Sequence, residues 1–200
     1  MSRILCLLGK AGVGKDTLAA GLLKNKKATK AVSYTTRPKR EGEIEGEDYY
    51  FISKEQFLKM KYNGEFLEET SYIVNGETWY YGFAKKTFEN FKGTLIAVIN
   101  PRGLEEIIKY PHLKKQLFVI HMKANESVRK ARYFEREKDL DEELKNKRWS
   151  ARVIQDEKDF ANVQNLLVKN RIDNTTLWTT FLSVDDMVRT LSWFVQNNLE

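Results

Sequence analysis

Residues 8–17, LGKAGVGKDT, have the side chains and the backbone freedom that could bind the phosphates of a nucleotide. Gly9, Gly12 and Gly14 allow positive φ angles and close approach, so successive backbone N–H groups can point at phosphate oxygens. Lys15 adds a positive charge, and a helix that begins near Asp16 would direct its N-terminal dipole at the same point. We therefore predict nucleotide contacts from the loop and the first helical turn, at Gly9, Ala11, Gly12, Val13, Gly14, Lys15, Asp16 and Thr17.

The end of this loop departs from the usual pattern, in which a serine or threonine directly follows the lysine and its hydroxyl binds magnesium. Here Asp16 follows Lys15, and the hydroxyl comes one residue later, in Thr17. Asp16 could hold a magnesium-bound water. It could equally be a first-turn acid that the helix dipole favours. Asp16 and Thr17 are the candidate metal residues, and both interpretations of Asp16 stay open.

A pair of arginines could form a second phosphate site. Arg37 and Arg40 lie three residues apart on a loop that a proline stiffens, so both guanidinium groups can converge on one phosphate. Tyr49 and Tyr81 could add phenolic donors to it. The alternative is a surface ion-pair cluster, in which the arginines pair with Glu41, Glu43 or Glu45.

Two further residues could recognise a base. A buried carboxylate at Glu68 would accept hydrogen bonds from N1–H and the exocyclic amine of guanine together, a pattern that adenine cannot offer. The hydroxyl of Ser33 could meet the O6 acceptor of the same base.

Arginines of a later, densely charged segment could close over a phosphate donor. Arg132 and Arg136 lie one helical turn apart and so project from the same face, and Arg148 follows across the segment. Phosphoryl transfer needs in-line positioning and charge neutralisation rather than a general base, and Lys15 with these arginines could supply the positive charge. The alternative for these arginines is an ordinary solvated charged helix.

The elements that must position these residues follow an α/β order. Continuous apolar runs predict strands buried on both faces of a parallel sheet, at residues 3–8, 94–99 and 116–122, with a last short strand at 166–168. Helical patterns cover residues 18–24, 104–109, a long segment from about 125, and 183–197. A Ser183 and Asp186 cap opens the last of these helices, and the basic run 24–30 is interpreted as a solvated helix end and loop.

A block of short strands interrupts this order. Strand-like segments at 48–53, 65–70 and 78–81 accompany a helix at 54–62, which a Ser53 and Gln56 capping box opens, and Asn75-Gly76 predicts a hairpin turn. We predict a small inserted domain at 33–92, a core made of residues 1–32 and 93–200, and a mobile lid at about 132–152.

Composition narrows the class of protein. The 200-residue chain is 42% hydrophobic and 31% charged, which is typical of a globular protein and excludes a disordered one. No apolar run approaches the roughly 20 residues of a membrane span, and the N-terminus lacks the layout of a signal peptide. Cys6 is the only cysteine, which predicts a reducing cytoplasm and argues against a structural zinc site. The net charge of +6 suits a protein that handles polyphosphates, and no nucleic-acid-binding motif accompanies it.

Residues 33–43, SYTTRPKREGE, and 46–51, GEDYYF, closely resemble the acceptor signature of guanylate kinases, which are P-loop nucleoside monophosphate kinases. The loop at 8–17, the segments Phe66-Leu67-Glu68 and Tyr80-Tyr81-Gly82, and the lid arginines resemble the same family in the same order, so the resemblance covers most of the chain. It implies an α/β fold, with a P-loop NTPase core whose parallel sheet is flanked by helices, a small inserted α+β acceptor-binding domain and a helical lid.

The same resemblance implies an activity, namely transfer of the γ-phosphoryl group of ATP to GMP or dGMP with Mg²⁺. It places Ser33 and Glu68 on the base, and the acceptor phosphate on Arg37, Arg40, Tyr49 and Tyr81. It gives catalytic roles to Lys15, Arg37, Arg132, Arg136 and Arg148. The implied partners are small-molecule nucleotides, with no specific nucleic acid and no membrane.

Three positions depart from the family pattern. Phe83 stands where the family usually has a hydroxyl near the base, Asn100 stands where it has a carboxylate, and Asp16 follows the loop lysine. These departures motivate one alternative, a deoxynucleoside monophosphate kinase with altered or broadened base choice. A second alternative is a non-catalytic interaction module of guanylate kinase type, against which the intact Lys15 and loop glycines argue.

Overall fold

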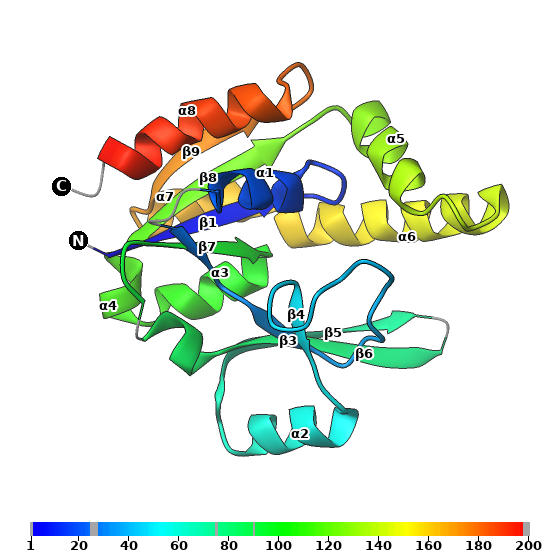
Figure 1. Ribbon diagram of the computed structural model, residues 1–200, viewed down its shortest axis with the longest axis horizontal. Helices are drawn as coiled ribbons and strands as arrows, with labels where there is room; N and C mark the ends of the chain where they lie inside the picture. The colour runs from blue at the N-terminus through cyan, green and yellow to red at the C-terminus, as the bar shows by residue number, and fades with distance from the viewer. Residues whose placement is uncertain (1, 25–27, 75, 90, 198–200) are drawn as a thin grey trace.

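A five-stranded parallel sheet forms the centre of the molecule, in the order β2-β7-β1-β8-β9 (Figure 1). The computed structural model describes residues 2–24, 28–74, 76–89 and 91–197. The strands of this sheet are β1 (Arg3–Gly9), β2 (Ala28–Lys30), β7 (Thr94–Ile99), β8 (Leu117–Lys123) and β9 (Asp173–Trp178). Every neighbouring pair is parallel, so the carboxyl ends of the strands meet at one edge. Ligand sites of parallel α/β sheets lie at that edge.

Helices cover both faces of this sheet, because its inner strands are apolar on both faces. Along β1, Ile4, Cys6 and Leu8 join one core cluster, and Leu5 and Leu7 join the other. The first cluster is closed by α3 (Pro101–Ile108), α4 (Pro111–Lys114) and α7 (Val163–Lys169). The second is closed by α1 (Lys15–Leu22) and α8 (Val184–Asn197).

A second sheet, in the order β4-β3-β6-β5, is built from residues 33–84. Its strands are β3 (Ser33–Thr35), β4 (Tyr49–Phe51), β5 (Phe66–Val74) and β6 (Glu77–Ala84), and a 3₁₀ turn (Lys85–Phe88) follows them. Tyr34 and Tyr80 pack on Phe57 of α2 (Lys54–Tyr62), which lies on the side away from the central sheet (Figure 1). Because strand side chains alternate, Ser33 and Tyr81 face the opposite way.

Two helices follow β8, and together with the turn between them they include residues 132–152, the region predicted as a lid. They are α5 (Glu126–Arg136) and α6 (Glu142–Phe160), which project together at the right of Figure 1. Tyr133 of α5 packs on Trp149 of α6, with ring centroids 5.3 Å apart. Asp141 caps α6 by accepting a hydrogen bond from the backbone N–H of Leu144 at 2.8 Å. The two helices are thus held against each other by an aromatic contact, and α6 has its own N-terminal cap.

The predicted α/β class, with a parallel sheet flanked by helices, is confirmed. The Ser53 and Gln56 capping box and the cap at Ser183 are also present. Asn75 of the predicted hairpin turn lies outside the described residues. The boundaries proposed for the core, the inserted domain and the lid remain a prediction.

Two local predictions are wrong. Residues 166–168 belong to α7, and the last strand is β9, because a short apolar run has no period that separates a strand from a helix. Residues 28–30 of the basic run form β2, which pairs with β7 rather than lying in a loop. Within the described part of the chain, no helix is both long enough and apolar enough to cross a bilayer.

Candidate active site

The glycine-rich loop joins β1 to α1 at the carboxyl edge of the central sheet. Gly12 and Gly14 have φ angles of 77° and 92°, in the left-handed region that favours glycine. A Cβ atom on Gly12 would also lie 2.4 Å from the carbonyl oxygen of Arg129. The loop therefore requires glycine at position 12 for its backbone conformation and for its packing against α5.

The Lys15 ammonium lies along this loop, where its Nζ donates to the carbonyl oxygens of Gly9 at 2.7 Å and Lys10 at 3.2 Å. Burial lowers the pKa of Lys15 to about 8; the Asp16 carboxylate opposes this fall, and the Arg152 guanidinium adds to it. A bound polyanion would favour the charged form again. The arrangement suits an ammonium that neutralises phosphate.

Two residues that the sequence analysis missed hold the loop in place. Asp156 of α6 is 1% exposed, and its Oδ2 accepts a hydrogen bond from the backbone N–H of Ala11 at 2.8 Å. Arg129 of α5 donates to the carbonyl oxygen of Ala11 at 3.3 Å and lies 3.5 Å from the same Asp156 oxygen. Both lid helices are thereby tied to the loop. Arg129 lies three residues before Arg132 and could have been suspected, whereas Asp156 is one carboxylate among many in its helix.

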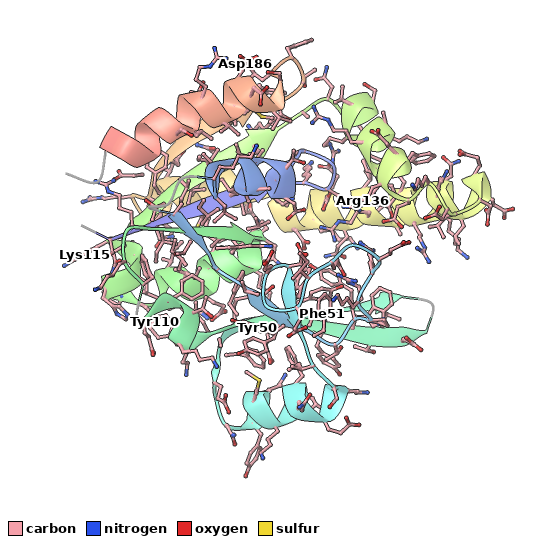
Figure 2. The ribbon with its side chains drawn as sticks, viewed as in Figure 1. Tyr50, Phe51, Tyr110, Lys115, Arg136 and Asp186 are labelled. Atoms are coloured by element: carbon pink, nitrogen blue, oxygen red, sulfur yellow. The ribbon has the colours of Figure 1, made fainter. Side chains whose placement is uncertain are left out.

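Arg37 lies between a carboxylate and two aromatic rings, and it is 5% exposed. Its Nη1 and Nη2 donate to the two oxygens of Glu43 at 3.0 and 2.7 Å. Its Cζ lies 5.3 Å from the ring centroid of Tyr49 and 5.7 Å from that of Phe51, which Figure 2 labels on the inserted sheet. The rings of Tyr49 and Tyr81 are 6.0 Å apart. The structure therefore brings Arg37, Tyr49 and Tyr81 together, and it pairs the buried Arg37 with the half-buried Glu43, one of the carboxylates that the ion-pair alternative names.

The two tyrosines of this group keep their protons at neutral pH. Burial raises the pKa of Tyr49 to about 12. Burial also raises the pKa of Tyr81, although the nearby Arg37 guanidinium opposes the shift. Both phenols can therefore act as hydrogen-bond donors.

A second carboxylate, Glu137 at the end of α5, contacts Arg40 from the loop that also holds Arg37, and arginines of α5 and α6. Nη2 of Arg40 lies 3.7 Å from Oε1 of Glu137, and Nε of Arg136 lies 3.4 Å from the same oxygen. Nη1 of Arg148 lies 3.6 Å from Oε2, and Figure 2 labels Arg136 in this part of the lid. Because a carboxylate is an anion, the arrangement shows that arginines from the loop and the lid can reach one negative group. The sequence analysis missed Glu137, which carries no signal besides its charge.

Arg132 instead contacts the glycine-rich loop and the turn after β9. Its Nη2 donates to the carbonyl oxygen of Thr179 at 2.9 Å, and its Nη1 donates to the hydroxyl of Thr179 at 3.2 Å. The same Nη1 lies 3.5 Å from the carbonyl oxygen of Val13. The three predicted arginines thus take two directions: Arg132 contacts the glycine-rich loop, whereas Arg136 and Arg148 contact Glu137.

Glu68 of β5 lies beside the first turn of α3 and is 8% exposed. Its Oε2 is buried and has no hydrogen-bond partner among the described residues. Burial raises the pKa of Glu68 to about 7, although a hydrogen bond from the Phe83 backbone and the charge of Arg102 oppose the shift. A buried oxygen without a partner indicates a place for a donor from a ligand.

Ser33 and Glu68 flank β6 on one face of the inserted sheet. In the strand register, Glu68 of β5 is opposite Phe83 of β6, and Tyr34 of β3 is opposite Gly82. Phe83 therefore lies between Glu68 on one side and Ser33 on the other. The Phe83 ring is buried, with its centroid 5.6 Å from that of Phe88. Phe83 therefore fills the core between the two polar residues.

Asp16 and Thr17 lie exposed in the first turn of α1. Asp16 raises the pKa values of both Lys15 and Tyr49, so its carboxylate lies near these two side chains. Among the described residues, no group of three histidine, cysteine or acidic side chains could hold a metal ion.

Comparisons with known proteins consistently find guanylate kinases. A family model described as Guanylate kinase matches residues 1–180. The guanylate kinase of Mycoplasmoides gallisepticum is 30% identical over 191 residues, which cover 92% of this chain and 91% of that protein. That of Anaplasma phagocytophilum is 43% identical over 89 residues, which cover 44% of this chain, and the match spans 40% of that relative's length. A crystal structure of the Anaplasma phagocytophilum guanylate kinase has the same fold, with a TM-score of 0.66 and 22% identity over 99% of this chain and 86% of that chain.

Proposed function

This chain belongs to the guanylate kinase family, and we propose from that premise that it transfers the γ-phosphoryl group of ATP to GMP or dGMP. The observation that carries the proposal is the meeting of Arg40, Arg136 and Arg148 around one carboxylate. Positive groups of the acceptor loop and of the lid lie within reach of a single anion. Transfer between two phosphate groups requires this proximity.

The proposed reaction uses the chain's own positive groups and needs no general base. An oxygen of the acceptor phosphate forms a bond to the γ-phosphorus while the bond from that phosphorus to the β–γ bridging oxygen breaks, which leaves ADP. Arg37, Arg40, Tyr49 and Tyr81 hold the acceptor phosphate in this proposal. Lys15, Arg132, Arg136 and Arg148 neutralise the donor.

Magnesium fits the first turn of α1 by the chemistry of its donors. Asp16 and Thr17 offer exposed oxygen atoms beside the loop, and Mg²⁺ usually keeps several waters and binds one or two protein oxygens together with substrate phosphates. We propose that these two residues hold the ion directly or through water. When bound, it would neutralise phosphate charge.

Glu68 supports guanine as the base, because its unpaired buried oxygen can accept from a ligand donor. Ser33 is proposed to meet O6. The departures at positions 83 and 100 do not favour the alternative of another base, since Phe83 fills the core. Asn100 caps α3 by accepting a hydrogen bond from the backbone N–H of Gly103 at 2.7 Å. The cytoplasm stays the predicted setting, on the basis of the single cysteine.

A panel of ribo- and deoxynucleoside monophosphates tests the proposal in a coupled assay of ADP release. We expect turnover with GMP and dGMP above that with AMP, CMP and UMP. Lys15→Ala should abolish it. Poor turnover with both guanine nucleotides and good turnover with another monophosphate would contradict the acceptor assignment. Partner binding that survives Lys15→Ala, in a protein without turnover, would favour an interaction module.

A further inference from the structure

Arg152 lies on α6 one helical turn after Arg148, so both project from the same face of that helix. The proposed function gives Arg152 no role, and the inference drawn from it rests on that function. Arg152 is about one-third exposed, and it lies on the part of α6 that contacts the phosphate loop. Arg152 is therefore nearer to the glycine-rich loop than Arg148, which pairs with Glu137.

One side of Arg152 forms an ion pair with the carboxylate that also accepts a hydrogen bond from the loop. Nε of Arg152 lies 3.1 Å from Oδ1 of Asp156, while Oδ2 of the same residue accepts from the backbone N–H of Ala11 at 2.8 Å. Asp156 is buried and contacts both the arginine and the loop.

The other side of Arg152 faces Tyr72, whose ring packs against that of Tyr81. Its Cζ lies 5.7 Å from the ring centroid of Tyr72, and that ring is 5.8 Å from Tyr81. Nδ2 of Asn100, at the end of β7, lies 3.5 Å from the hydroxyl of Tyr72. Arg152 is thus placed between the donor loop and a tyrosine proposed to hold the acceptor phosphate.

The terminal nitrogens of the Arg152 guanidinium are available to donate hydrogen bonds, and the positively charged Lys15 lies nearby. Across the described ranges, neither Nη1 nor Nη2 of Arg152 donates a hydrogen bond to a protein group, and its ion pair with Asp156 is made through Nε. The Arg152 charge lowers the pKa of Lys15, so two positive groups lie close together beside the loop. Like charges held together are stabilised by an anion that both can reach.

We propose that Arg152 is a further catalytic residue, which donates from Nη1 and Nη2 to the phosphoryl group during its transfer, and that Asp156 is the positioning residue that sets its direction. The transfer step is unchanged: the acceptor oxygen bonds to the γ-phosphorus, the bond to the β–γ oxygen breaks, and ADP leaves with that electron pair. No proton moves. Arg152 acts on the negative charge of the moving group, which is where a positive donor accelerates the reaction.

The test compares Arg152→Gln with Arg189→Gln in the full chain. Arg189 lies on α8 and its side chain is 81% exposed, so its loss removes the same charge away from the loop. We expect Arg152→Gln to lower kcat about 100-fold or more, as loss of one transition-state donor does, with KM for ATP and GMP changed by less than about fivefold. Arg189→Gln should match the wild type. Circular dichroism and melting temperature report whether each variant is folded.

Chemical rescue separates a catalytic role from a structural one. Added guanidinium ion, at concentrations too low to unfold the protein, should restore part of the kcat of Arg152→Ala. It should not restore the activity of Asp156→Asn, which keeps the arginine but loses its anchor. Arg152→Lys should recover part of kcat, because it keeps the charge without the planar fork.

Two results would overturn the inference. The first is a kcat for Arg152→Gln within about threefold of the wild type, given a wild type that phosphorylates GMP; the proposed function would then stand. The second is a loss that neither lysine nor guanidinium restores. A wild-type protein that phosphorylates no nucleoside monophosphate would instead overturn the proposed function, and the inference with it.

Discussion

Lowering the pH from 8 to 6 should weaken GMP binding through the protonation of Glu68. This carboxyl group is buried, and its pKa in the free protein is about 7. Guanine offers two N–H donors, which only the ionised carboxylate can accept together. Protonated protein must therefore lose a proton before it binds the base in the proposed manner.

The size of the effect follows from the fraction of ionised Glu68. With a pKa of about 7, the group is about nine-tenths ionised at pH 8 and about one-tenth ionised at pH 6. The apparent dissociation constant is the intrinsic one divided by this fraction, so KM for GMP should rise about tenfold. The second ionisation of the GMP phosphate, with a pKa of about 6, adds a smaller effect of its own.

The assay measures KM for GMP at saturating ATP across this pH range, in the wild type and in Glu68→Gln. The phosphate ionisation is common to both proteins, so the difference between the two slopes isolates Glu68. Calorimetry in buffers of different ionisation enthalpy should show release of nearly one additional proton at pH 6 when the wild type binds GMP. An equal pH slope in the two proteins would refute the reasoning.

The same shifted pKa has a consequence for stability. Between pH 4.5 and 7, the folded protein holds a proton on Glu68 that the unfolded chain releases, so stability falls as pH rises through this window. The shift corresponds to about 3 kcal/mol. In the absence of nucleotide, Glu68→Gln should therefore raise the melting temperature at pH 8 and change it little at pH 4.5.

Three further predictions concern single residues. Gly12→Ala should lower stability by about 1–3 kcal/mol and weaken ATP binding, because its Cβ would lie 2.4 Å from a carbonyl oxygen; Gly42→Ala, with φ of 81° and open space, is the matched control in melting and ATP titrations. Arg37→Lys should raise KM for GMP about 10- to 100-fold and leave KM for ATP unchanged, because the bidentate fork is lost; equal changes in both constants would contradict this role. Cys6, whose pKa burial raises to about 12, should react with a thiol reagent only after unfolding in urea, and rapid reaction of the folded protein would count against its burial.

The parts of the structure that could be predicted from sequence are those with local causes. The glycines at 12 and 14 have the positive φ angles that their place in the loop indicated. The helix at residues 54–62 begins at its Ser53 cap, because a capping box depends only on neighbouring residues. Residues 94–99 form a strand with the predicted bounds, since a continuous apolar run suits a strand buried on both faces.

The parts that could not be predicted depend on contacts between distant segments. β9 is a mostly exposed strand at the edge of the sheet, so it lacks the apolar pattern that marks an inner strand. Asp156 lies in a charged helix and Glu137 directly follows one, where one carboxylate resembles the next until the loop and the arginines fold against them. The direction of Arg40 toward the lid likewise depends on how α5 ends.

The central claim is direct passage of a phosphoryl group between two facing phosphate sites. Incubation of the protein with GMP and ATP labelled at the γ-phosphate, followed by separation of the products, tests it most directly. The account predicts that the label appears in GDP, in an amount equal to the ADP formed. Label released as inorganic phosphate, with GMP unchanged, would contradict it.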